Sequence, residues 1–321
     1  MLKVSIDNNR VRIGERFTVS FQRTLRIPDD GKVYPLPPGL GAFPIHRVED
    51  YLDRVPDSWS EEGGVFIPMY QREALWLGFG GASWKPNAVK VGVGKVNAIS
   101  GDEWDEKLHE DPQDYVVCPD QPWLDGINAG DGFIRQFVAI PLGLGYTVEA
   151  QVTGKEEFGG IQILVYEPKP GRFPDQPPPE RDKTLHRLSM PAAVSQMGLG
   201  AGGQMRQKIY PDPYGIDAWD VNNFGHIFVH IINSEQYRDL TALEPPPTPI
   251  SAKIYTEFGL PWFDLYDEAK SDITASKKLT KVRTIREKDI EKGVSSGKDD
   301  TSINVSESQI KKLRHSKKRK K

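Results

Sequence analysis

The glycine-rich run at residues 198–203 is the segment whose residue types come closest to a ligand-binding motif. It contains the letters G-x-G-x-x-G, but a dinucleotide site needs a strand before the motif and a helix after it, and neither flank fits. The run could instead form an anion nest, in which successive backbone N–H groups point at one phosphate or carboxylate. A tight glycine loop without a ligand is the simpler alternative. The anion-binding candidates are Gly198, Gly200, Gly202, Gly203, Arg206 and Lys208.

His226 and His230 have the four-residue spacing that brings two imidazoles to one face of a helix, where they could share a metal ion. The residues between them, Ile227, Phe228 and Val229, favour a strand instead. On a strand the two side chains stand about 13 Å apart at about 3.3 Å per residue, too far for one ion. The pair is therefore a weak metal candidate, and we predict no metal site and no cofactor.

Seven tryptophans offer chemistry of another kind, because an exposed indole beside carboxylates or amides forms a platform for a sugar ring. The alternative is that the rings fill the core and pin the proline-rich segments. They are Trp59, Trp76, Trp84, Trp104, Trp123, Trp219 and Trp262. The single cysteine, Cys118, follows two valines, which predicts a buried and unreactive thiol.

The last eleven residues carry eight fixed positive charges and form the most specific local signal. Such a run contacts polyanions, either nucleic acid or an anionic lipid surface, without reading sequence. Nuclear import in a eukaryote, and folding back onto an acidic body, are further alternatives. The candidate contact residues are Lys311, Lys312, Arg314, Lys317, Lys318, Arg319, Lys320 and Lys321.

Charge divides the chain near residue 269. Residues 269–321 hold 17 of the 42 Lys and Arg but only 7 of the 45 Asp and Glu, which gives this segment a formal net charge of +10. Residues 1–268 hold the other 25 basic and 38 acidic residues, and their formal net charge is −13. The first 268 residues also hold every aromatic residue and can bury a core, whereas the rest lacks the apolar surface that offsets ordering entropy. We therefore predict an acidic β-rich body over 1–268 and a disordered basic tail over 269–321.

The elements that must position these residues are mainly strands. Alternating apolar residues predict strands over 2–6, 11–21, 89–93, 133–140, 146–152, 161–165 and 227–232. Residues 133–140 and 146–152 should form a hairpin that 161–165 extends into a meander. Prolines exclude a regular helix or central strand at 35–44, and the prolines and glycines of 167–220 predict a long loop insertion. The predicted fold is mostly β: an antiparallel sandwich or barrel-like body with proline-rich loops and few short helices.

Five runs resemble a family of uncharacterised hypothetical proteins, some of which carry the label integral membrane protein. They are P-L-P-P-G-L-G at 35–41, D-P-Q-D-Y at 111–115, D-Q-P-W-L-D at 120–125, R-Q-K-I-Y-P-D-P at 206–213 and G-L-P-W-F-D-L-Y-D at 259–267. The resemblance covers most of residues 1–268 and excludes the tail. It implies no activity, cofactor or site residue.

The most apolar run, residues 137–144, is far shorter than the roughly 20 residues of a membrane helix, and the N-terminus lacks a signal-peptide pattern. We expect no transmembrane span and an intracellular, cytoplasmic protein, with the nucleus open in a eukaryote. The predicted function is a non-enzymatic binding or assembly protein whose basic tail contacts polyanions or neighbouring copies. The alternatives are an enzyme acting on a phosphate or carboxylate compound at the Gly198–Gly203 loop and a carbohydrate-binding module.

Overall fold

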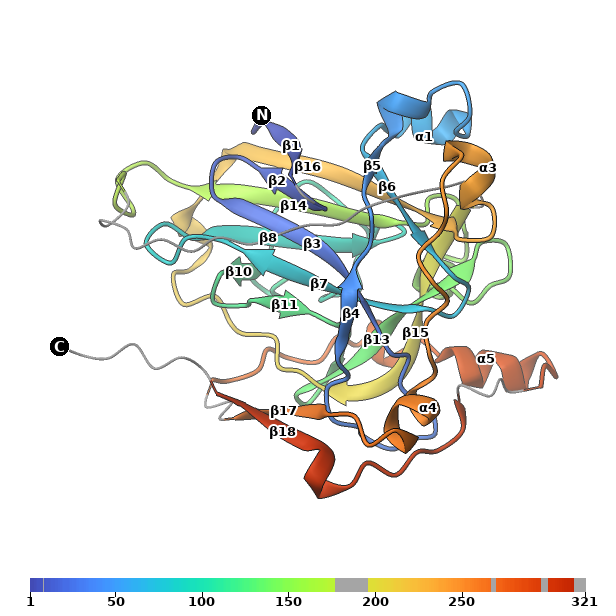
Figure 1. Cartoon of the computed structure of the whole chain (residues 1–321). Helices are drawn as coiled ribbons and strands as arrows, with labels where there is room; N and C mark the ends of the chain where they lie inside the picture. The colour runs from blue at the N-terminus through green and yellow to red at the C-terminus, as the bar shows by residue number, and fades with distance from the viewer. Residues whose placement is uncertain (8, 177–195, 267–269, 296–299, 315–321) are drawn as a thin grey trace.

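The architecture was taken from a computed structural model, which describes residues 1–7, 9–176, 196–266, 270–295 and 300–314. Sixteen strands form one sheet. Ten of them follow the order β1-β2-β3-β7-β13-β15-β16-β14-β8-β10, and the other six pair beside this path. The pairs within this sheet are antiparallel except β16 with β6, and β17 pairs in parallel with β18 in a separate two-stranded sheet. The predicted mostly β fold with few short helices is confirmed (Figure 1).

The strands of the large sheet are β1 (Val4–Asp7), β2 (Arg10–Ile13), β3 (Phe17–Thr24), β4 (Gly39–Ala42), β5 (His46–Arg47), β6 (Val65–Met69), β7 (Ala74–Gly80), β8 (Asn87–Val93), β9 (Val96–Asn97), β10 (Val116–Cys118), β11 (Trp123–Leu124), β12 (Gly126–Gly130), β13 (Phe133–Pro141), β14 (Ile161–Pro168), β15 (Gln196–Arg206) and β16 (Trp219–Asn233). The small sheet holds β17 (Trp262–Tyr266) and β18 (Ile310–Arg314). The α-helices are α1 (Asp57–Glu62), α2 (Val148–Thr153), α3 (Tyr237–Thr241), α4 (Ala252–Glu257) and α5 (Ile285–Glu291). Single 3-10 turns are η1 (Val48–Tyr51), η2 (Ile216–Ala218), η3 (Leu279–Lys281) and η5 (Glu307–Gln309). Among the described residues, no helix has the length and apolar character needed to cross a bilayer.

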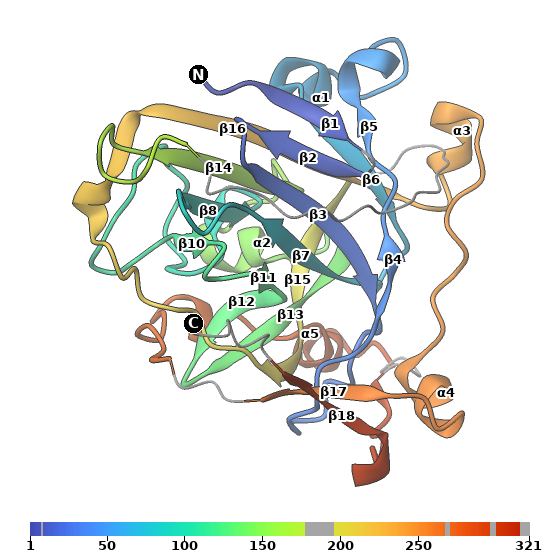
Figure 2. The same ribbon diagram turned by 60° about the vertical axis from the view of Figure 1, so that its left-hand side comes forward.

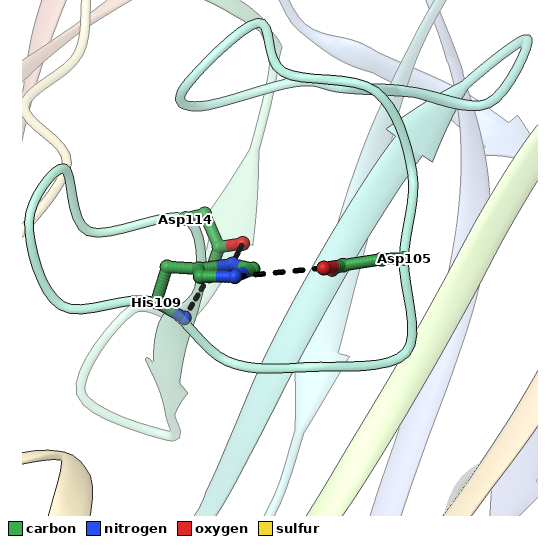
Figure 3. Close-up of side chains that lie close together, drawn as sticks. All are labelled: Asp105, His109 and Asp114. Carbon is green, nitrogen blue, oxygen red and sulfur yellow. Dashed lines mark hydrogen bonds and ion pairs between the residues drawn. The ribbon is translucent and has the colours of Figure 1, made fainter.

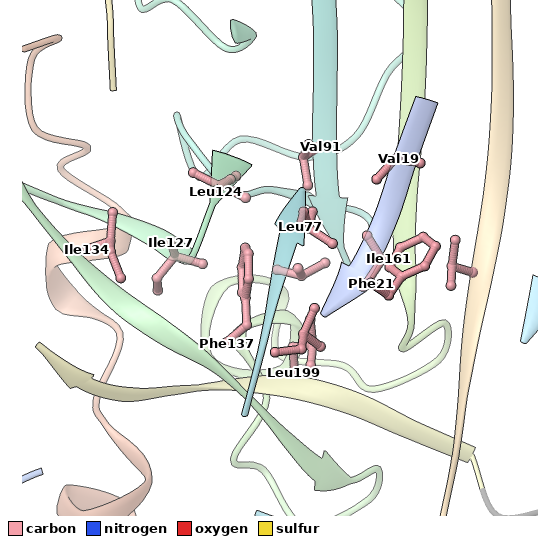
Figure 4. Packing of buried hydrophobic residues seen from close by; sticks show 14 of the residues in the cluster. Val19, Phe21, Leu77, Val91, Leu124, Ile127, Ile134, Phe137, Ile161 and Leu199 are labelled. Atoms are coloured by element: carbon pink, nitrogen blue, oxygen red, sulfur yellow. The ribbon is translucent and has the colours of Figure 1, made fainter. Parts of the chain in front are cut away.

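The large sheet curls back on itself, so that β3 and β7 face β8 and β14 across one apolar core (Figures 1 and 4). Strand alternation supplies this core: Val19 and Phe21 of β3, Val91 of β8 and Ile161 of β14 are all fully or almost fully buried. The opposite face of β8 and β14 is buried as well, in a second cluster that includes Leu164. Because both faces of these strands are covered, the sheet has a thick, rigid centre.

Two predicted elements are wrong. Residues 146–152 were expected to pair with 133–140, but they form α2, which Thr147 caps by accepting a hydrogen bond from the Ala150 N–H at 3.0 Å. The neighbour of β13 is therefore not this segment but β15, whose residues 196–206 lie inside the predicted loop insertion of 167–220. Residues 177–195 of that insertion lie outside the described residues.

The expectation of disorder over 269–321 is wrong for residues 270–295 and 300–314. Leu279, Val282 and Ile285 are buried at 0–2 % exposure, and α5 begins at a complete capping box of Thr284 and Glu287. A few aliphatic side chains are enough, because they fill gaps on a body that is already folded instead of building their own core. The described part of this basic segment runs along the lower end of the molecule in Figure 2.

Candidate functional site

An aromatic pocket of about 260 Å³ opens where β7, β11, β17 and the chain before β4 meet. We call residues 35–38 the proline strap. The pocket is lined by Leu36, Pro37, Gly39, Trp76, Trp123, Asp125 and Phe263. Trp76, Trp123 and Phe263 are each half-buried, so their rings contribute to the pocket surface and not to the core.

The register of β7 and β11 places the two indoles side by side. Trp123 pairs with Gly78, and residues opposite each other point to the same face of the sheet. Trp76 lies two residues before Gly78 and therefore shares that face. A Cβ at position 78 would lie only 2.8 Å from Ser20 Oγ and 3.1 Å from Trp76 Cζ3. The absence of a side chain at Gly78 thus allows the Trp76 ring to lie over the strand.

Asp125 provides the carboxyl group of the pocket. It stands two residues after Trp123, and its Oδ2 accepts a hydrogen bond from Trp123 Nε1–H at 2.7 Å. Its backbone is held on both sides, because the Asp125 N–H donates to Gln207 Oε1 at 2.9 Å and the Asp125 carbonyl accepts from the Phe137 N–H at 3.0 Å. Burial raises the pKa of Asp125 to about 7, although the hydrogen bond from Trp123 opposes that rise. Near neutral pH both the protonated and the ionised forms of Asp125 are therefore populated.

The far wall comes from the proline strap and β17. Leu36 and Phe263 exchange two backbone hydrogen bonds of 2.8 and 3.0 Å, which tie the strap to β17. Thr24 Oγ1 anchors the strap to β3 by donating to the Pro38 carbonyl at 2.8 Å. On β17 the fully buried Trp262 precedes Phe263, so strand alternation turns the Phe263 ring outward toward the pocket. The pocket is thus built on strands and a restrained strap, with a single carboxyl group among apolar walls.

A second cluster has the composition of a metal site. Asp105, His109 and Asp114 bring ligand atoms within 4.8 Å of one another (Figure 3). The buried ammonium group of Lys90 already contacts both carboxylates, at 2.5 Å from Asp105 Oδ1 and 2.7 Å from Asp114 Oδ2. It also donates to the Lys107 carbonyl at 2.6 Å. Because a fixed positive charge compensates the acids, we interpret the cluster as a structural network that holds the 102–114 loop against β8.

The predicted glycine loop is a strand. Gly198 and Gly200 pair with Ile140 and Val138 of β13, so this part of the run belongs to the sheet and forms no anion nest. A Cβ at Gly202 would lie 2.6 Å from Val138 Cγ2, and one at Gly203 would lie 2.5 Å from the Pro28 carbonyl oxygen. The glycines serve close packing, which corrects the anion-binding prediction for Gly198, Gly200, Gly202 and Gly203.

The two basic candidates beside that run do not converge with it. Arg206 is exposed and lines a separate pocket of about 410 Å³ with Asp264 and Tyr34. Lys208 Nζ donates to the Lys270 carbonyl at 3.0 Å. The enzyme alternative at Gly198–Gly203 therefore loses the arrangement on which it depended.

His226 and His230 both lie on β16, as the strand interpretation predicted. His226 is exposed, with Nδ1 3.2 Å from Glu106 Oε1. His230 is stacked between Trp59 and Phe228, each ring at a centroid distance of 4.4 Å, and its Nε2 donates to the Gly63 carbonyl at 2.9 Å. Burial lowers the pKa of His230 to about 4. The two imidazoles have unrelated partners and do not form a common site.

The tail candidates divide at residue 314. Lys311 and Lys312 lie exposed on β18, and the backbone of Arg314 ends that strand. The remaining candidates, Lys317, Lys318, Arg319, Lys320 and Lys321, lie outside the described residues.

Sequence reasoning named the tryptophans as a group but did not single out the pocket. Trp59, Trp219 and Trp262 are buried, whereas Trp76, Trp84, Trp104 and Trp123 are half-buried. The one local signal was the two-residue spacing of Trp123 and Asp125, which on a strand puts both on one face. No spacing linked them to Phe263, because that contact depends on the folded chain.

Comparisons with protein-family models, with curated proteins and with solved structures find no match to this chain.

Proposed function

We propose that this chain is a non-enzymatic binding protein and that its aromatic pocket takes a methylated ammonium group. The observation that carries the proposal is the convergence of Trp76, Trp123 and Phe263 around the Asp125 carboxyl group. Aromatic rings attract cations through their quadrupole, and each desolvated contact contributes about 0.5–2 kcal/mol. An ionised carboxylate supplies the opposite charge. The described residues that line this pocket pair no nucleophile with a base, which is why binding and not catalysis is proposed.

The polarity of the pocket favours a cation over a sugar. A sugar ring carries several hydroxyl groups, and each one that is buried without a partner has a desolvation cost. Among the described residues that line this pocket, Asp125 is the one ionisable side chain, and its Oδ2 already accepts from Trp123 Nε1–H, so the indole N–H of Trp76 is the main donor left for a hydroxyl group. A quaternary ammonium group has no donors or acceptors to satisfy. Carbohydrate binding therefore remains the second candidate, supported by the two neighbouring indoles alone.

The direct experiment is a calorimetric titration of the full chain with tetramethylammonium, for which we expect a Kd of about 1 mM. Asp125→Asn keeps an acceptor for Trp123 but removes the charge, so it should weaken binding about tenfold. Trp123→Ala should abolish measurable binding. The matched control is Trp84→Ala, which removes a half-buried indole outside the pocket and should leave the affinity unchanged.

The pH dependence sharpens this test. Because the pKa of Asp125 is raised to about 7, affinity should increase as the pH rises from about 6 to 8, and the increase should disappear in Asp125→Asn. The proposal is overturned if tetramethylammonium does not bind. If the chain binds a methyl glycoside but not tetramethylammonium, and Trp76→Ala abolishes that binding, the result supports carbohydrate binding instead.

We also propose that the basic end contacts a polyanion, as the opposite charges of residues 1–268 and 269–321 suggest. The supporting observation is that Lys311 and Lys312 are exposed on β18. Removal of residues 315–321, which leaves β18 intact, should weaken salt-sensitive association with anionic partners or with further copies of the chain. Association that persists unchanged in this truncated chain would contradict the proposal.

A further inference from the structure

An exposed apolar surface surrounds α4. Ile254 and Phe258 lie one helical turn apart with 45 % and 74 % of their surface exposed, and Ile250 and Leu260 flank them at 43 % and 39 %. The opposite side of the helix is packed, because Ala252 and Tyr255 are buried. We call these four exposed side chains the α4 apolar patch. Large apolar side chains grouped in this way commonly mark an interaction surface.

The patch stands on a rigid base. Ser251 caps α4 by accepting a hydrogen bond from the Ile254 N–H at 3.3 Å. The Tyr255 hydroxyl donates to the Pro261 carbonyl at 3.0 Å, and Trp262 Nε1–H donates to Thr256 Oγ1 at 3.1 Å. Trp262 is itself fully buried. The apolar side chains are therefore displayed by a fixed turn, and their exposure is a property of the fold.

Positive charge lies next to the patch. Gln309 joins β18 to α4, because its Nε2 donates to the carbonyls of Thr256 and Leu260 at 3.0 and 3.2 Å. Two residues further on, Lys311 is exposed and its Nζ donates to the Ser308 carbonyl at 3.4 Å. Lys312 is also exposed and is paired with Asp264 in the register of β17 and β18. Figures 1 and 2 both place α4, β17 and β18 at the same lower end of the molecule. The sequence continues from β18 into five consecutive basic residues at 317–321.

Among the described residues, the acids of this region are equal in number to its lysines, Lys253, Lys311 and Lys312. Glu257 lies 4.0 Å from Lys253 on α4 and forms a local pair with it. Asp264 and Glu307 are exposed near β18, but eight basic residues lie between positions 311 and 321. An excess of positive charge would come from the basic run at 317–321, which follows β18 in the sequence.

We propose that this end of the molecule docks on an anionic lipid bilayer. The α4 apolar patch would enter the boundary between headgroups and acyl chains while Lys311, Lys312 and the basic run contact anionic headgroups. Each lysine close to such a surface strengthens binding about fivefold. Stable attachment of a peripheral protein takes two signals, an apolar one and a polybasic one, and both are present here. A nucleic acid would use the charge but would offer the aliphatic side chains no apolar surroundings.

The test is co-sedimentation of the full chain with phosphatidylcholine vesicles that contain or lack phosphatidylserine. We expect binding to the phosphatidylserine vesicles that decreases with added salt. Phe258→Ser with Ile254→Ser should weaken this binding at least tenfold, and Lys311→Glu with Lys312→Glu should do the same. The matched control is Ile290→Ser, which removes a 66 % exposed isoleucine from α5 and should leave binding unchanged.

Urea unfolding of each variant verifies that the fold is retained, as expected for exposed positions. The proposal fails if the wild-type chain binds neither vesicle, or if the α4 variant binds as tightly as the wild type. It also fails if the chain binds poly-uridylate in place of vesicles, or if sedimentation shows self-association that the α4 variant abolishes. The lipid proposal rests on the polyanion contact proposed above for the basic end, and binding to poly-uridylate in place of vesicles would refute the lipid proposal while leaving that contact supported. None of these outcomes depends on whether the aromatic pocket binds a cation.

Discussion

Asp289 tests whether the basic C-terminal segment is an integral part of the fold. This residue of α5 is fully buried and accepts two hydrogen bonds from Arg72, at 2.7 and 2.8 Å, and one from the Tyr146 hydroxyl at 2.9 Å. Asp289→Ala would leave the Arg72 guanidinium and the buried Tyr146 hydroxyl without this partner. Removing one member of a buried ion pair costs about 3–5 kcal/mol. Because 20 % of the Arg72 side chain is exposed and water can hydrate it, we expect the free energy of unfolding to decrease by the lower end of this range, about 3 kcal/mol.

Urea unfolding followed by tryptophan fluorescence measures this loss. With an m-value of about 3 kcal/mol/M, the midpoint should fall by about 1 M. Glu291→Ala is the matched control, because Glu291 lies on the same helix and forms half-exposed pairs with Arg283 and Lys288. Exposed pairs are screened by solvent, so Glu291→Ala should change the urea midpoint little. If Asp289→Ala destabilises the protein no more than Glu291→Ala, α5 is not docked as described.

The stability difference between wild type and Asp289→Ala should depend on pH. Burial raises the pKa of Asp289, but the hydrogen bonds from Arg72 and Tyr146 outweigh burial and leave the pKa below its ordinary value. The folded state therefore favours the charged form, and this stabilisation is complete above the ordinary pKa of about 4. It is lost as the pH falls through the lowered pKa of the folded state. The stability difference between wild type and Asp289→Ala should accordingly narrow below about pH 4.

Three further predictions concern buried groups. Gly202→Val should lower the urea midpoint, because the new Cβ would lie 2.6 Å from Val138 Cγ2 and overpacking costs about 1–3 kcal/mol; an unchanged midpoint would contradict the close packing of β13 and β15. Burial lowers the pKa of His46 and His230 from 6.5 to about 4, so the unfolded state binds more protons between these values. Because the raised pKa of Asp125 acts in the opposite direction over this range, the histidine effect is measured as the difference in stability between wild type and His230→Gln. This difference should decrease as the pH falls from 6.5 toward 4, and a difference that stays constant would refute the burial of the His230 ring. Burial raises the pKa of the Cys118 thiol to about 12, so a thiol reagent at about pH 8 should react only after unfolding in urea.

Local residue patterns determined several of the strands of this chain but not all of them. The alternation of Val89, Val91 and Val93 specifies a strand because a period of two puts all three side chains on one face, and β8 forms there. The same reasoning failed at residues 146–152, where Thr147 initiates α2. A capping hydroxyl at that position and Gly154 at the end of the helix outweighed the apolar alternation.

Composition also misjudged the C-terminal segment. Residues 269–321 cannot build a core of their own, but Ile285 is buried against the folded body instead. It packs against Gly200 of β15, where an added Cβ would lie 3.2 Å from Ile285 Cγ1. This burial depends on a space that β15 leaves in the folded body. The composition of residues 269–321 alone therefore cannot reveal it.

The pocket shows the same division between local and long-range information. The sequence by itself named Trp76 and Trp123 only as two of seven tryptophans, and its one local signal was the two-residue spacing of Trp123 and Asp125, which puts both on one face of an extended chain. Only the tertiary structure decided that β11 pairs with β7 and that Phe263 closes the far wall. The physical reason is that periodicity describes a few neighbouring residues, whereas strand register and strap position are set by packing between segments that are far apart along the chain.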